Sequence, residues 1–142
     1  MNTERPLSAS PTDDLARLLL RVALGLLLLM HGIAKLRGGV DWITGMLSGA
    51  GLPAILAYGV YVGEIVAPLM LIAGVRTRAA AAIVVVNMLF AVGLVHTGDL
   101  ARVTEVGAWA LETQALFTLG ALTLLLSGGG RLAIGRLHPR LA

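Results

Sequence analysis

The stretch LARLLLRVALGLLLLMHGIAKL, residues 15–36, is apolar enough to enter a membrane, yet it carries two arginines, a histidine and a lysine. At about 100° per residue, Arg17, Arg21, His31 and Lys35 fall on one narrow stripe of a helix. Hydrocarbon penalises charged side chains, so we expect this stripe to face protein or trapped water. The pattern predicts a helix bundle in which the other helices surround the stripe.

The composition is that of an integral membrane protein. Of the 142 residues, 57% are hydrophobic and 13% are charged, and the mean hydropathy is +0.87. Soluble domains carry about 25% charged residues. The chain has no cysteine, which excludes disulfides, thiolate metal sites and thiol redox relays. The net charge of +3 comes from arginines near predicted helix ends, so we expect lipid headgroups rather than nucleic acid as partners.

Four apolar segments predict an all-α domain over residues 15–127, a bundle of four transmembrane helices. Each segment is close to the ~20 residues that a helix needs to cross a bilayer. The predicted spans are residues 15–36, 53–75, 79–96 and 108–127.

Shorter segments flank and connect these spans. In the first loop, the apolar side chains of Trp42, Ile43, Met46 and Leu47 predict a short helix lying at the membrane interface. Residues 1–14 are predicted to be a mobile polar tail in which Thr12 caps the first helix. Residues 128–142 are predicted to be a basic cytoplasmic tail.

The distribution of basic residues predicts the orientation. Four spans place both termini and the second loop on one side, and that side holds eight arginines: Arg5, Arg17, Arg21, Arg76, Arg78, Arg131, Arg136 and Arg140. The other side holds three basic residues, Lys35, Arg37 and Arg102. Because cytoplasmic loops are enriched in Lys and Arg, we predict a multi-pass protein of a bacterial-type inner membrane with both termini in the cytoplasm.

Glu64 lies at the middle of the second predicted span, about 16 Å from either end. Pro68 has no N–H to give to the Glu64 carbonyl, so we expect the helix to kink there. Carboxyl groups inside a membrane are candidates for proton handling or ligand contact, although a purely structural hydrogen bond is the alternative. Lys35 is near the outer end of its own helix, and we therefore expect it to lie too far away to pair with Glu64.

The remaining polar residues of the spans predict a shared pocket towards the outer leaflet. His31 and Lys35 are one helical turn apart. His96 stands where the third span ends, and Glu112 stands where the fourth begins. The predicted ligand-binding residues are His31, Lys35, Glu64, His96 and Glu112. Asn87 and Gln114 point away from His96 and Glu112 on helical wheels, and we expect them to be structural. No set of metal ligands is apparent.

Several of these residues belong to segments that resemble a known family. HGIAK (31–35), GEIVAPLMLIAGVRTRAAA (63–81), His96 and LET around Glu112 are similar to the DoxX family of small four-helix membrane proteins. The resemblance covers nearly all of residues 15–135. By motif it extends to His31, Gly32, Lys35, Glu64, Thr77 and Arg78; His96 and Glu112 match by position.

The resemblance implies a membrane subunit of an oxidoreductase system, because the family includes proteins similar to the small subunit of thiosulfate:quinone oxidoreductase. On this reading quinone is engaged near the outer leaflet, with His31, Lys35 and Glu64 as catalytic residues. His31, Lys35 and His96 would hydrogen-bond the carbonyls, while Glu64 and Glu112 would carry protons. The sequence has no flavin motif, dinucleotide fingerprint or cysteine-bound cluster, so electrons would come from a soluble or membrane redox partner.

Two other classes of function stay open at this point. One is a non-catalytic membrane anchor or small-molecule carrier, in which the buried charges serve assembly or transport. The other is a single-haem carrier with His31 and His96 as axial ligands. The sequence does not identify the substrate, the partner protein or the oligomeric state, and a homo-oligomer is among the alternatives.

The basic-residue distribution makes a direct prediction about topology. A reporter fused after Ala142 should be active only in its cytoplasmic form, because eight basic residues on one side oppose three on the other. Paired fusions to a cytoplasm-active and a periplasm-active reporter make the measurement. Activity of the periplasmic reporter alone would invert the bundle and move the predicted pocket to the cytoplasmic leaflet.

Overall fold

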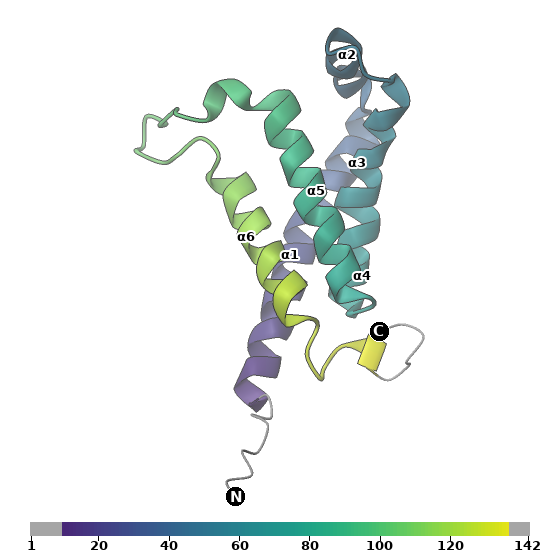
Figure 1. Ribbon diagram of the computed structural model, residues 1–142, viewed down its shortest axis with the longest axis vertical. Helices are drawn as coiled ribbons and strands as arrows, with labels where there is room; N and C mark the ends of the chain where they lie inside the picture. Colours follow the sequence, from purple (N-terminus) through teal and green to yellow (C-terminus); the bar gives the residue numbers. More distant parts are fainter. Residues whose placement is uncertain (1–9, 137–142) are drawn as a thin grey trace, which may run out of the picture.

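The computed structural model describes residues 10–136, and within that range the regular structure is helical apart from one isolated antiparallel bridge between Val103 and Trp109 (Figure 1). The all-α prediction is therefore confirmed. Most of the predicted N-terminal tail, residues 1–9, and the last part of the C-terminal tail, residues 137–142, lie outside the described residues.

The longest helix is α1 (Pro11–Gly38), followed by the short α2 (Asp41–Gly49). A compound helix comes next, made of a 3-10 segment η1 (Ala54–Tyr58), α3 (Gly59–Tyr61), a π segment η2 (Val62–Val66) and α4 (Ala67–Ala73). The chain continues through α5 (Thr77–Val95), η3 (Thr97–Asp99), α6 (Glu112–Ser127) and η4 (Ile134–Arg136).

Three helical segments of the described chain are long and apolar enough to cross a membrane: Pro11–Gly38, Ala54–Ala73 and Thr77–Val95. The fourth predicted span, residues 108–127, is helical only from Glu112, and the 16 residues of α6 cover about 24 Å, less than the ~30 Å of a hydrocarbon core. The predicted count of four crossings is thus not confirmed. The backbone just before α6 bonds within the loop instead, where the Ala110 N–H donates to the Arg102 carbonyl.

The start of α1 differs from the sequence prediction. The helix begins at Pro11, a favourable first helical residue because its missing N–H has no partner there. Ser10 precedes it, and the Ser10 N–H donates to the Asp13 carboxylate at 3.1 Å. The prediction that Thr12 is the cap is therefore wrong, and four residues assigned to the tail belong to the helix.

The second predicted span is irregular around Glu64. The Ala67 N–H donates to the Val62 carbonyl, five residues back, so this turn is π-helical. A π turn places an extra residue in the helix and is frequent at functional sites. It directly precedes Pro68, which cannot donate to the helix ladder. The disturbance expected at Pro68 is thus a π turn that contains Glu64.

The short helix predicted in the first loop is present as α2. Ile43 and Leu47 are buried and pack against Ala57 of the compound helix, whereas Trp42 is 50% exposed and Met46 is 36% exposed. The apolar side chains of α2 therefore divide between a protein contact and an open face. Its location at a membrane interface stays a prediction.

The main core lies where α1, α4, α5 and α6 pack together, with the most extensive contacts between α5 and α6 and between α1 and α4. Its fully buried large side chains are Leu28, Leu71, Val84 and Leu124. Figure 1 shows that the start of α1, the turn between α4 and α5, and the end of α6 all lie at one end of the molecule. We call this the Arg21 end.

Arg21 is buried and joins three parts of the chain at the Arg21 end. Its guanidinium NH1 donates to the carbonyls of Leu71 and Ile72 at 3.0 Å and 2.5 Å. These carbonyls belong to the last turn of α4, where the helix leaves acceptors without partners. The guanidinium NH2 donates to the Leu132 carbonyl at 2.8 Å, beyond the end of α6.

Further contacts hold the segment after α6 at the same end. The buried Asp14 carboxylate accepts the Arg131 backbone N–H at 2.8 Å, and the Gly135 N–H donates to the Gly74 carbonyl at 3.0 Å. The first part of the predicted C-terminal tail is therefore packed against the bundle. The sequence analysis did not predict this, because the contacts join residues far apart in the chain.

Close packing at Gly32 predicts the stability of two variants. A Cβ at Gly32 would overlap the Glu64 carbonyl oxygen, whereas a Cβ at Gly93 in α5 would meet nothing within 4 Å. Gly32→Ala should cost about 1–3 kcal/mol of stability, and Gly93→Ala should be neutral or gain about 0.5–1 kcal/mol from helix propensity. Thermal unfolding in one detergent compares them. Equal stability of the two variants would contradict the contact between α1 and the π turn.

Candidate functional site

A cavity of about 690 Å³ lies between α1, α2, the compound helix, α5 and α6, at the end of the bundle away from Arg21. Most of its walls are apolar. The polar and charged side chains that line it are His31, Lys35, Glu64, Asn87, His96, Thr113 and Gln114. An apolar cavity with a few polar groups is the usual form of a small-molecule binding site. Four of the five predicted ligand-binding residues therefore share one cavity.

Lys35 and Glu64 form an ion pair in this cavity. Lys35 Nζ lies 2.5 Å from Glu64 Oε2, and the two side chains are only 20% and 7% exposed. The expectation that Lys35 lies too far from Glu64 is therefore wrong. Gly32 explains the difference, because its missing side chain lets the backbone of α1 lie against the Glu64 carbonyl. The long lysine side chain then spans the remaining distance.

Asn87 completes the surroundings of the Glu64 carboxylate. Its Nδ2 donates to Glu64 Oε1 over a long 3.5 Å, and its side chain lies against Gly63, where a Cβ would overlap it. The prediction that Asn87 lies away from the pocket is wrong. One signal was available in the sequence, since Asn87 is the only polar side chain between Arg78 and the end of α5.

His31 lies one helical turn deeper along α1 than Lys35. Its ring meets the ring of Phe117 edge to face, with the centroids 5.7 Å apart and the planes at 85°. Both residues line the cavity, which places the imidazole on the wall formed by α1 and α6. The helical periodicity of the first span correctly predicted that His31 and Lys35 share one side of α1, and His31 itself is exposed.

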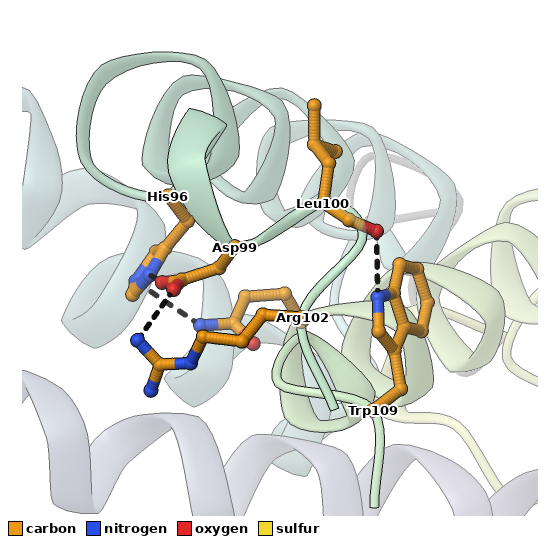
Figure 2. A network of polar contacts seen from close by, with 6 residues as sticks. His96, Asp99, Leu100, Arg102 and Trp109 are labelled. Carbon is orange, nitrogen blue, oxygen red and sulfur yellow. Dashed lines mark hydrogen bonds and ion pairs between the residues drawn. The ribbon is translucent and has the colours of Figure 1, made fainter. Parts of the chain in front are cut away.

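His96 links the cavity to the loop before α6 (Figure 2). Its Nδ1 lies 3.0 Å from Asp99 Oδ2, and its Nε2 lies 3.2 Å from Gln114 Nε2. The Asp99 carboxylate can only accept, so Nδ1 carries the proton, and Nε2 faces the side-chain amide of Gln114. Gln114 also lines the cavity, so the prediction that it points away from the pocket is wrong.

The loop around His96 is held by its own polar contacts. Arg102 donates to Asp99 Oδ1 at 2.9 Å, and the Trp109 indole N–H donates to the Leu100 carbonyl at 2.9 Å (Figure 2). The hydrogen bond from His96, helped by the charge of Arg102, holds the pKa of Asp99 below its ordinary value. Asp99 therefore stays ionised near neutral pH and keeps His96 oriented.

The structure does not bring every predicted residue to the cavity. Glu112 is exposed at the start of α6 and is not among the lining residues. Thr77 is buried at the Arg21 end, where Arg78 donates to the Leu126 carbonyl at 3.2 Å. Among residues 10–136, no group of three or more His, Asp or Glu side chains could hold a metal ion.

Comparison with known proteins gives the family. The DoxX family profile matches residues 16–97, which is more than half of the chain and includes His31, Lys35, Glu64 and Asn87. The chain belongs to the DoxX family. Together with the three long apolar helices, this membership makes it a DoxX membrane protein.

Two relatives of this DoxX protein match over most of its length. An uncharacterized protein of Haemophilus influenzae is 32% identical over 115 residues, covering 81% of this chain and 84% of the relative. A Bacillus subtilis protein with the name "Putative oxidoreductase CatD" is 26% identical over 121 residues, covering 85% of each. No solved structure matches the chain significantly.

The buried ion pair predicts a non-additive pattern of stability. Removing one partner of a buried pair leaves an uncompensated charge and costs about 3–5 kcal/mol. Lys35→Met and Glu64→Leu should therefore each destabilise the protein, and the double variant Lys35→Met/Glu64→Leu should recover much of the loss. Arg37→Met, two residues along α1 and exposed, is the matched control. Thermal unfolding in detergent measures all four variants; additive effects of the Lys35 and Glu64 substitutions would contradict the pairing.

Proposed function

We propose that this DoxX protein is the quinone-engaging membrane subunit of an oxidoreductase system. The observation that carries the proposal is the Lys35–Glu64 ion pair inside an apolar cavity of about 690 Å³. A bilayer protein has little reason to keep a desolvated charge pair at a cavity wall unless the pair meets a ligand, because desolvation offsets much of the attraction. The name of the Bacillus subtilis relative supports the oxidoreductase class.

The lining residues fit a quinone head group. Its flat ring is apolar and suits the aliphatic and aromatic walls, and its carbonyl oxygens need hydrogen-bond donors. Lys35 has three N–H donors and directs one to Glu64, so it can donate to a ligand as well. His31 adds an imidazole one helical turn from Lys35 on the same side of α1. These side chains would hold and orient the head group.

Quinone, when bound, supplies an acceptor for two electrons and two protons. Lys35 is the group in this chain best suited to hand a proton to a ligand oxygen, because its ammonium lies in the cavity wall. Glu64 keeps that ammonium in position and balances its charge. Glu112 is exposed outside the cavity, so its proposed exchange of protons would take place with the surroundings rather than at the ligand.

Electrons must reach the site from another protein, because this chain has no cysteine and no flavin or dinucleotide motif. We therefore propose a redox partner that docks on the DoxX protein in a bacterial-type inner membrane, with both termini in the cytoplasm. The haem alternative is less well supported. His96 has both ring nitrogens engaged, by Asp99 and by Gln114, and an axial ligand needs one of them free.

Quinone binding can be measured directly through Trp42, which lines the cavity. In a Trp109→Phe background Trp42 is the only tryptophan, and we expect a short-chain benzoquinone to quench its fluorescence saturably. Lys35→Leu and His31→Leu should each weaken binding about tenfold or more, since each removes a donor to the ligand. Arg37→Leu, an exposed charge on the same helix outside the cavity, should leave the affinity unchanged.

Two results would overturn the proposal. One is quenching that does not saturate, combined with no quinone in a solvent extract of protein purified from its native membrane. The other is equal affinity in the wild type, Lys35→Leu and His31→Leu. The absorption spectrum of the same preparation tests the haem alternative independently, since haem has a strong visible absorption band.

A further inference from the structure

Asn87 occupies an unusual place in α5. The helix is otherwise apolar between Arg78 and its end at Val95, and Asn87 is half-buried in it. A half-buried amide is costly in apolar surroundings unless its polar atoms find partners. Gly63, which has no side chain, makes room for Asn87 next to Glu64. The cavity wall is thus built to accept an amide at this position.

The ion pair fixes which way this amide points. Glu64 Oε2 accepts from Lys35 at 2.5 Å, and this contact holds Oε1 of the same carboxylate towards Asn87. Asn87 must therefore turn its NH₂ group to Glu64 Oε1, at 3.5 Å. Its carbonyl oxygen Oδ1, which lies next to Gly63, makes no hydrogen bond within the described residues and is left as an acceptor. Asn87 itself lines the cavity.

We infer that Asn87 Oδ1 accepts a hydrogen bond from a hydroxyl group of the bound ligand, and that the site therefore prefers the hydroquinone to the quinone. The inference rests on the proposed function. A quinone offers only acceptors, which Oδ1 does not attract, whereas a hydroquinone carries two O–H donors. Lys35 can donate to an oxygen of either form, so the discrimination falls on Asn87.

A preference of this kind changes the redox chemistry of the site. One hydrogen bond gained by the reduced form, against an unfavourable contact in the oxidised form, corresponds to about a tenfold difference in affinity. For a two-electron couple, a tenfold preference for the reduced form raises the reduction potential of the bound ligand by about 30 mV. Asn87 thereby makes a bound quinone a better acceptor for electrons from the partner protein.

The test compares the affinities for a short-chain para-benzoquinone and for its hydroquinone, by anaerobic titration calorimetry of the full chain in detergent. Wild-type protein should bind the hydroquinone about tenfold more tightly. Asn87→Leu should bring the ratio of the two affinities close to one. Asn87→Ala should do the same, and it provides the test should Asn87→Leu fail to fold.

Ala91→Leu is the matched control. Ala91 lies one turn after Asn87 on α5 and also lines the cavity, so this substitution narrows the same wall without changing its hydrogen-bonding groups. It should change both affinities by the same factor and leave their ratio near ten.

The outcomes separate this inference from the proposed function. Wild-type protein that binds the two forms equally, or Asn87 variants that retain the tenfold ratio, would overturn the role of Asn87 while quinone binding stands. Wild-type protein that binds neither form would overturn the proposed function and this inference with it. A ratio that also collapses in Ala91→Leu would show that the shape of the cavity, and not the Asn87 amide, sets the preference.

Discussion

The Lys35–Glu64 ion pair inside an apolar bundle is the constraint on which the end of the protein away from Arg21 depends. Lys35 and Glu64 meet at 2.5 Å, and neither side chain is more than 20% exposed. Such a pair is stable only when its geometry is close and the remaining oxygen of the carboxylate is also bonded. The neighbouring residues meet both needs: Gly32 lets α1 approach, and Asn87 donates to the other oxygen. The π turn presents Glu64 to both.

Buried polar groups find their partners differently at the two ends of the bundle. At the Arg21 end, the Arg21 guanidinium donates to carbonyls of α4 and of the segment after α6, and the packing there is closed. At the other end the polar side chains line open space, and several retain hydrogen-bonding capacity for a ligand. The loop from His96 to Glu112 borders this space through the contact of His96 with Gln114. One end of the protein is therefore closed by hydrogen bonds, and the other surrounds a cavity.

Local periodicity was sufficient for much of the fold and for part of the site. The stripe that contains His31 and Lys35 was predicted from spacing, and both residues line the cavity. The helical-wheel argument failed for Asn87 because it extended the helix to His96, whereas α5 ends at Val95 and His96 has φ −118° and ψ 18°. The depth argument failed for Lys35 and Glu64 because it treated both spans as straight and regular. A 3-10 segment and a π turn change the rise and the phase of the second.

Other features are not encoded locally at all. The hydrogen bond from Arg21 to Leu132 joins residues 111 positions apart, and the one from Arg131 to Asp14 joins residues 117 apart. Chains are made from the N-terminus, and early segments begin to assemble before late ones exist. Arg21 can therefore reach the carbonyls of α4 while the ribosome is still at work, but its last partner, Leu132, is made only after α6. The packing around Arg21 is completed only once the segment after α6 has left the ribosome.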